Sequence, residues 1–419
     1  MTSLLKLYNT LTRKLEIFKP LEEGKVKMLT CGPSIYQLPH IGNYRTFVFE
    51  DILHRYLEYL GYKVERVLNI TDVEDKALAE AKKQNINLKE LTNRNIETFI
   101  SELKQLNVKI PDYLPRSSTS VDQAVNLIEI LLEKGYAYRY THNGRKNIYY
   151  DPLKFDGFGK LFGLDMSRWP KKKRRFHRDT YTGNRWNRGD FILWHGYKEG
   201  DKVYWDTRIG RGRPSWNIQD PAMMPKSFDF KADIWCSGID STYRHHDYII
   251  AVVEAVTGEP FVCRWLHAGH LLLDGEKMSK RKGNIEYPAG LLEAKCIWDH
   301  IRFFFIYDHY RRKLNFTFKE YTQGCRLLES FRDMVKKLGV AEGGEQKSSV
   351  EAKKLVKQIK TDFEENMNND LRVKAAFDAL HKTVSRLAKL KEKQMLSADD
   401  SKEALAKLKA IDYVLQAIL

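Results

Sequence analysis

The stretch CGPSIYQLPHIGNYRT (31–46) decides the fold class of this chain. Before it, KVKMLTCG (25–32) has the apolar pattern of a strand and runs into a Gly-Pro turn. After it, TFVFEDILHRYLEYLG (46–61) repeats apolar residues at helical spacing and ends on a glycine. A second strand pattern with an acidic loop follows in KVERVLNITDVEDK (63–76). This order predicts an α/β fold with a parallel sheet, whose ligands bind at the carboxyl ends of the strands.

The start of the predicted helix has the chemistry of a phosphate site. A helix N-terminus presents free N–H groups and the positive end of its dipole to an anion. Gly42 allows an adenine or a ribose to approach the backbone closely. His40 can donate a hydrogen bond to a triphosphate as charge builds up on the α-phosphorus.

A second motif, DGEKMSKRKGN (274–284), follows about 240 residues later on a loop flanked by glycines. Two lysines on a mobile loop, Lys277 and Lys280, can hold a departing pyrophosphate. Each motif alone also has a non-functional interpretation. The first could contain a chance surface histidine, and the second could be a basic surface loop. Together and in this order they predict an ATP-dependent enzyme that forms an adenylate.

Composition excludes several classes of protein. A chain of 419 residues predicts about two to four domains. The mean hydropathy of −0.52 and the lack of an apolar run of about 18 residues exclude a membrane span. The N-terminus lacks the pattern of a signal peptide, and five widely spaced cysteines without a CxxC pair predict a reduced, cytoplasmic protein.

The net charge of +16 predicts a polyanionic partner. Much of the excess lies in 151–216, where a basic run is followed by Phe176, Tyr181 and Trp186. Basic residues interleaved with aromatic ones suit a nucleic-acid strand, although a solvated basic loop is the alternative. The run comprises Lys171, Lys172, Lys173, Arg174 and Arg175.

Shifts in composition predict four parts of the chain. Residues 1–134 form the first half of a nucleotide-binding core, and 135–216, rich in Tyr, Trp, Gly and Arg, form an inserted domain. Residues 217–318 return to strands and loops and carry the lysine motif, and 319–419 are helical.

The two motifs resemble the HIGH and KMSKS motifs of class I aminoacyl-tRNA synthetases, and the family that the chain resembles is cysteinyl-tRNA synthetase. Further stretches resemble that family in the family's order: RVLNITDVEDK, FDGFGKL, DFILWH, GRPSWNIQDPAM, RHHDY and LHAGHLLLDGEKMSKRKGN. The resemblance implies a Rossmann core, an inserted connective peptide that contacts the acceptor end of tRNA, and a C-terminal helical bundle. It also implies a monomer that uses ATP with Mg²⁺ to activate an amino acid and transfers it to tRNA.

The resemblance implies roles for individual residues. The catalytic positions are His40, Asn43, Lys277 and Lys280. The ATP-binding positions are Gly32, Gly42, Gly269, Met278 and Ser279. The positions of the amino-acid pocket are Tyr36, Thr71, Trp216, Trp235 and Asp240, for which packing is the alternative role.

The chain departs from the family where the family reads the cysteine thiol. The family holds a zinc ion with two Cys, one His and one Glu. Cys31 and His245 match two of these ligands, but Asp220 stands at the second cysteine and Ile249 at the glutamate. We therefore expect zinc to be weak or absent, so that the pocket either distinguishes cysteine poorly from serine or prefers another amino acid. The alternative is a site formed by Cys31, Asp220 and His245 with an open position.

Two more departures bear on the pocket and on the acceptor. Asn43 replaces the last residue of HIGH, and Trp235 replaces a family histidine. The sequence contains no match to the small α/β domain with which many family members read the anticodon.

Three functions remain open: charging tRNA with cysteine, ligating an amino acid to a small amine as the mycothiol cysteine ligase does, and binding tRNA without catalysis. The basic insert favours the first over the second, and the intact lysine motif argues against the third.

Overall fold

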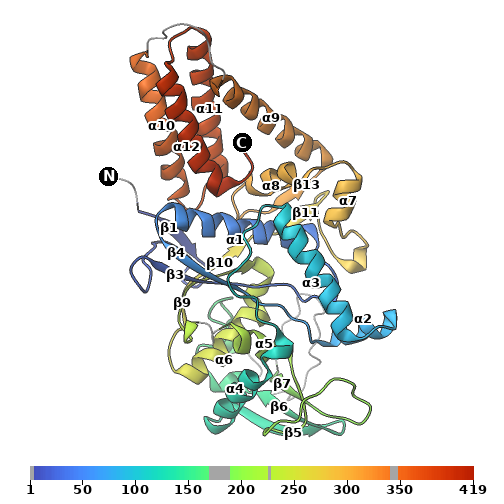
Figure 1. Cartoon of the computed structure of the whole chain (residues 1–419). Coiled ribbons are helices and arrows are strands. Elements are labelled where there is room, and N and C mark those ends of the chain that lie inside the picture. The colour runs from blue at the N-terminus through green and yellow to red at the C-terminus, as the bar shows by residue number, and fades with distance from the viewer. Residues whose placement is uncertain (1–3, 169–188, 225–227, 340–347) are drawn as a thin grey trace.

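A four-stranded parallel sheet forms the core of the computed structural model, which describes residues 4–168, 189–224, 228–339 and 348–419. Its order is β10-β9-β3-β4, with β3 Lys25–Thr30, β4 Lys63–Leu68, β9 Ala232–Gly238 and β10 Val262–Ala268. The helix α1 (Ile41–Tyr59) connects β3 to β4 and covers the sheet (Figure 1). The predicted strand, turn, helix and strand are therefore confirmed, and so is the α/β class.

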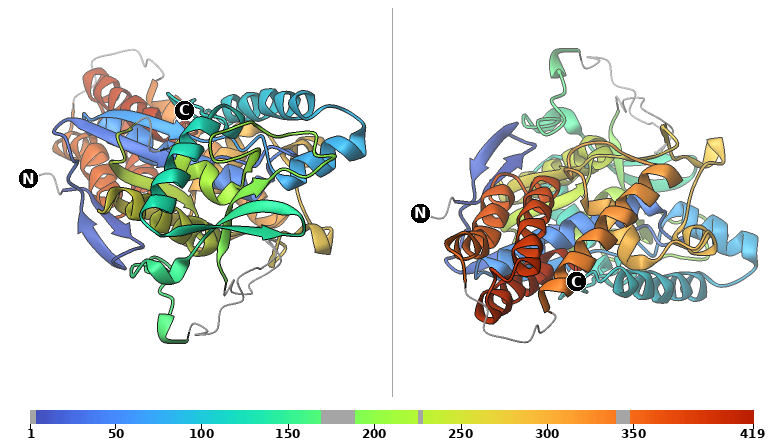
Figure 2. Two further views of the ribbon diagram at one scale, coloured as in Figure 1. Left: turned by 90° about the horizontal axis from the view of Figure 1, so that it is seen from below. Right: turned by 90° about the horizontal axis from the view of Figure 1, so that it is seen from above.

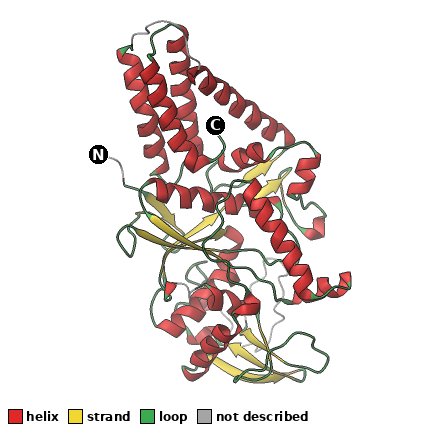
Figure 3. Cartoon of the chain, viewed as in Figure 1, coloured by secondary structure: helices red, strands yellow, loops and turns green. Residues whose placement is uncertain are grey.

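An antiparallel sheet lies at the opposite end of the molecule from the C-terminal helices (Figure 3). It packs with neighbouring helices around an apolar core of its own. The strands are β5 Ala137–His142, β6 Arg145–Tyr150, β7 Phe191–Gly196 and β8 Gly212–Pro214, and the helices are α4 Val121–Glu133, α5 Trp216–Met223 and α6 Asp247–Thr257. Because Phe191 stacks on Tyr248 of α6 at 4.0 Å between ring centroids, this sheet is tied to the second half of the core.

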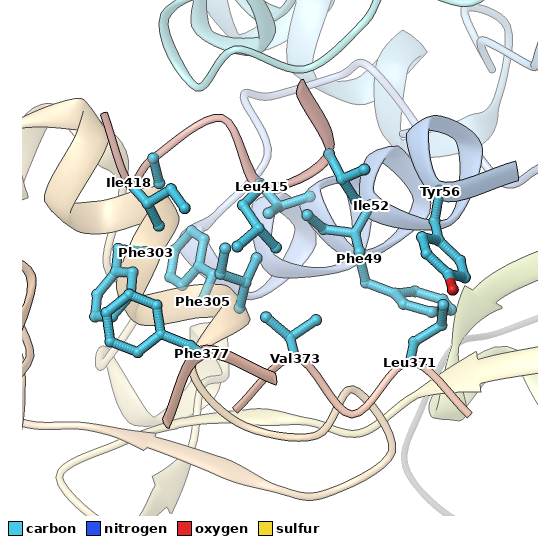
Figure 4. Packing of buried hydrophobic residues seen from close by; sticks show 14 of the residues in the cluster. Phe49, Ile52, Tyr56, Phe303, Phe305, Leu371, Val373, Phe377, Leu415 and Ile418 are labelled. Carbon is cyan, nitrogen blue, oxygen red and sulfur yellow. The ribbon is translucent and has the colours of Figure 1, made fainter. Parts of the chain in front are cut away.

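Four long helices form the C-terminal bundle, which lies over α1 when seen from above (Figure 2). They are α9 Phe318–Gly339, α10 Val350–Met367, α11 Val373–Glu392 and α12 Ala398–Leu415. Phe49 and Ile52 of α1 face Leu415 and Val373 in one apolar core (Figure 4). The bundle therefore packs directly on the helix that begins at His40-Ile41-Gly42-Asn43, called the HIGN motif below.

The remaining elements frame the site. They are β1 Lys6–Asn9, β2 Lys14–Ile17, α2 Asp75–Gln84, α3 Leu88–Gln105, β11 Leu271–Leu273, β12 Glu276–Lys277, α7 Pro288–Glu293, α8 Trp298–Ile306 and β13 Leu314–Phe316. The sequence analysis did not predict the β1–β2 hairpin, because each strand is only four residues long and alternates poorly. Within the described residues no helix is both long and apolar enough to cross a membrane.

Candidate active site

A cleft of about 790 Å³ opens at the carboxyl ends of the core strands. Cys31 directly follows β3, and Gly238 ends the neighbouring strand β9. The chain runs from β3 outward to β4 on one side and from β9 outward to β10 on the other, so this point is the switch in the strand order. Open parallel sheets bind their ligands at such a switch point.

The N-terminus of α1 forms one wall of the cleft, and His40 caps the helix. Its Nδ1 accepts a hydrogen bond from the Gly42 N–H at 3.1 Å, while Asn43 Oδ1 accepts from the His40 N–H at 3.1 Å. Burial lowers the pKa of His40, so the ring is neutral at neutral pH and carries its hydrogen on Nε2. A Cβ at Gly42 would lie 3.1 Å from Met278 Cε, so a larger residue would crowd the second motif.

The lysine motif forms the facing wall. Lys277 ends the short β11–β12 hairpin, and its Nζ lies 4.0 Å from Asp240 Oδ2 across the cleft mouth. Gly269 and Met278 also line the cleft, whereas the Ser279 N–H donates to Asn284 Oδ1 at 2.9 Å and shapes the loop. Lys280 begins a short 3-10 turn, and its side chain lies outside the described part of the chain.

Arg45, which the sequence analysis did not select, ties the two motifs together. It lies one turn into α1 and is buried. Its guanidinium donates to the carbonyl oxygens of Gly269 at 2.6 Å and Arg312 at 2.8 Å. Gly269 is required there, because a Cβ would come within 2.4 Å of the Arg312 carbonyl oxygen. The strand that leads into the lysine motif is thereby held against the HIGN helix.

Three of the five residues predicted for the amino-acid pocket line the cleft, and two lie elsewhere. Thr71, Trp216 and Asp240 line the cleft, and Trp216 stacks on His245 with 5.5 Å between ring centroids. Tyr36 lies instead in an adjoining cavity of about 430 Å³. Trp235 is fully buried behind Cys31, where its Nε1–H donates to Sγ at 3.1 Å. Trp235 therefore acts on the cleft through Cys31.

Gly32 has a packing role beside the cleft. A Cβ at this position would lie 1.7 Å from the Asn69 carbonyl oxygen, so only glycine allows the turn after β3 to pass the end of β4. Its N–H donates to Asn69 Oδ1 at 2.9 Å, and Asn69 Nδ2 donates in turn to Asp220 Oδ1 at 2.9 Å. Asn69 thus orients Asp220, which stands where the family has its second cysteine.

The floor of the cleft collects the candidate metal ligands. Cys31 Sγ lies 3.7 Å from His245 Nε2 and 3.1 Å from His246 Nε2, and Asp220 Oδ2 lies 2.9 Å from His245 Nε2. Cys31, His245 and His246 form a group whose donor atoms all lie within 4.8 Å of one another. The sequence analysis missed His246, although its position beside His245 in RHHDY was a signal that could have been used.

The charges at the floor depend on burial and on Asp220. Burial alone would lower the pKa of His245, but the charge and the hydrogen bond of Asp220 outweigh it and raise the pKa to about 10. Burial raises the pKa of the Cys31 thiol. Without a metal, the floor therefore holds an imidazolium paired with a carboxylate beside a neutral thiol.

Ile249 does not face this group as a ligand would. It is buried in an apolar cluster together with Trp235 and Leu29, on which Cys31 packs. Even so, one thiol sulfur, two imidazole nitrogens and a neighbouring carboxylate oxygen are a donor set that suits zinc. The residues present therefore fit zinc, the metal of the family that the chain resembles. The expectation of a weak or absent zinc was made without His246 as a possible ligand.

Comparison of this sequence with known proteins shows the family to which the chain belongs. The family model described as "tRNA synthetases class I (C) catalytic domain" matches residues 17–326. A cysteine–tRNA ligase of Chlamydia pneumoniae is 38% identical over 98% of this chain and 86% of its own length. The chain belongs to the cysteinyl-tRNA synthetase family of class I synthetases. A second cysteine–tRNA ligase, from Brachyspira hyodysenteriae, is 36% identical over 89% of this chain and 78% of its own length.

Solved structures confirm the class I fold. The methionyl-tRNA synthetase of Mycobacterium tuberculosis in complex with methionyl-adenylate matches with a TM-score of 0.66. The match covers 94% of this chain and 90% of that one at 14% identity, so it concerns the fold alone. The basic run 171–175, which we predicted to bind tRNA, lies outside the described residues of this family member.

Proposed function

We propose that the chain activates cysteine with ATP and transfers the cysteinyl group to tRNA. The observation that carries the proposal is that the two ATP motifs face one cleft whose floor contains Cys31 and His245. Relatives that are cysteine–tRNA ligases match nearly the whole chain, which favours tRNA over a small amine as the acceptor.

The proposed first step needs positioning and electrostatics more than a general base. An oxygen of the cysteine carboxylate attacks the α-phosphorus of ATP, the bond to the β-phosphate oxygen breaks, and pyrophosphate leaves with Mg²⁺. The neutral His40 ring donates from Nε2, and the Asn43 amide is held beside it. Lys277 and Lys280 stabilise the charge on the departing pyrophosphate. A zinc ion at the cleft floor, when bound, would supply a soft acceptor for the cysteine thiolate.

The same proposal assigns a role to each part of the chain. Residues 1–134 and 217–318 form the catalytic core, 135–216 contact the acceptor end of tRNA, and 319–419 form the helical domain. The basic run 171–175 supplies phosphate contacts. The protein acts as a monomer in the cytoplasm, where ATP, tRNA and reduced thiols occur together.

Exchange of labelled pyrophosphate into ATP, measured with each of the twenty amino acids, tests the first step. We expect exchange with cysteine, followed by cysteine-dependent charging of tRNA. Exchange that responds only to another amino acid would refute the choice of substrate. Exchange with cysteine but no charging of any tRNA would refute the acceptor.

A further inference from the structure

Two consecutive histidines point at one sulfur atom, which regular helix geometry does not allow. Successive side chains on an α-helix diverge by about 100°, since a turn takes 3.6 residues. Here the backbone is kinked within Thr242–His246, where Tyr243 is extended and Arg244 has a φ of 68°. Positive φ at a non-glycine residue costs free energy and is concentrated at functional sites. The strained turn brings the Nε2 atoms of both His245 and His246 to Cys31.

The surroundings of His246 are those of a metal-ligating histidine. Its Nδ1 lies 2.8 Å from His267 Nε2, and His267 Nδ1 lies 2.8 Å from Thr10 Oγ1. When His246 Nδ1–H donates to His267 Nε2 and His267 Nδ1–H donates to Thr10 Oγ1, the Nε2 lone pair of His246 faces Cys31. Histidines that bind metals usually donate their second ring N–H to a neighbour in this way, and the neighbour fixes the ring.

The sulfur is prepared in the same way. The Nε1–H of Trp235 donates to Cys31 Sγ at 3.1 Å, and Trp235 is itself locked by stacking on Trp265 at 5.2 Å between ring centroids. This hydrogen bond holds the sulfur in place beside the Nε2 atoms of His245 and His246.

We propose that His246 takes over the ligand role lost at Ile249, so that zinc is held by Cys31 Sγ and by Nε2 of His245 and His246. Asp220 lies beside His245, and His267 with Thr10 holds the ring of His246. The proposal rests on the proposed function for its choice of zinc. It replaces the expectation of a weak or absent zinc with a tight site of altered ligands.

Metal binding tests the proposal apart from catalysis. The full chain should bind one Co²⁺ in place of zinc, with the absorption bands of a thiolate-bound, four-coordinate ion. We expect His246→Ala to weaken Co²⁺ binding more than 100-fold and His267→Gln to weaken it about 10–100-fold, the usual range for a residue that supports a ligand. His300→Ala is the control, because His300, on the remote helix α8, pairs with Glu329 of α9, and its loss should leave binding unchanged.

A second measurement needs no variant, so it does not depend on whether His246→Ala folds. X-ray absorption at the zinc edge of the wild-type protein counts its ligands, and we expect one sulfur and two imidazoles. A protein that binds no stoichiometric metal, or binds it with a single imidazole, overturns the proposal. A protein that binds no metal but still exchanges pyrophosphate with cysteine would overturn this proposal alone. Zinc with the expected ligands but no exchange would overturn the proposed function alone.

Discussion

Replacing Asp51 with asparagine should weaken the contact between the catalytic core and the C-terminal bundle and lower the free energy of unfolding. Asp51 lies on α1, and its carboxylate accepts hydrogen bonds from the Lys109 N–H at 2.7 Å, Arg55 Nε at 2.9 Å and Arg302 Nη2 at 2.6 Å. The side chains of Asp51 and Arg302 are both 0% exposed. Arg302 also donates to the carbonyl oxygen of Leu415 at 2.8 Å, so this ion pair joins α1, α8 and the end of α12.

The size of the effect follows from burial. Asparagine keeps the shape of the side chain but removes the carboxylate that is in direct contact with the buried Arg302 guanidinium. Removing one partner of a buried ion pair costs about 3–5 kcal/mol of the free energy of unfolding. An exposed pair such as Asp333 with Lys336, 3.7 Å apart and 71% and 75% exposed, contributes less than about 1 kcal/mol. Asp333→Asn is therefore the matched control.

The pH dependence has a definite sign. Burial alone would raise the pKa of Asp51, but Arg302 and Arg55 outweigh it, and the pKa in the folded protein lies below its ordinary value of 3.8. The stabilisation is therefore fully present above that value and is lost as the pH falls through the folded pKa. In Asp51→Asn this acid-induced loss should be missing.

Urea unfolding at pH 7, followed by tryptophan fluorescence and far-UV circular dichroism, measures the effect. Arg302→Met and the double variant complete a mutant cycle, and we expect the double variant to be less destabilised than the sum of the single ones, since the buried Arg302 charge is no longer present without Asp51. A loss below about 1 kcal/mol for Asp51→Asn, or strict additivity in the cycle, would refute the reasoning.

Three further predictions concern function. Lys277→Ala should slow pyrophosphate exchange about 10²–10³-fold, the loss expected for one preorganised contact. Lys282→Ala is the control and should not slow exchange, because Lys282 Nζ pairs with Glu276 at 3.0 Å. Equal rates for the two variants would contradict the role of Lys277. Neutralising the run 171–175 should weaken tRNA binding and flatten its dependence on salt in filter-binding titrations, and an unchanged slope would place the tRNA surface elsewhere. Removing zinc with a chelator should lower the preference for cysteine over serine in the exchange assay to what the shape of the pocket alone provides, about 1–3 kcal/mol. An unchanged preference after complete removal of zinc would show that zinc does not set the preference.

Local patterns identified most of the secondary structure of the core. The strand 25–30, the helix that follows the HIGN motif and the strand 63–68 were each predicted from apolar periodicity and turn residues, and each is present. Such patterns can be read from sequence because one face of each element must be buried. The β1–β2 hairpin was missed because its strands are short and β1 packs against β10, a strand far along the chain.

The sequence by itself determined the α/β class, the family and the two ATP motifs. These depend on the order of residues within short segments, such as His40 and Gly42 at a helix start, and local backbone geometry follows from that order. Only the tertiary structure decided which side chains meet at the cleft floor and beneath α1. His246 lies 215 residues from Cys31, and Arg302 lies 251 residues from Asp51. No local pattern distinguishes such a ligand from a core histidine, because these contacts exist only once distant segments have packed together.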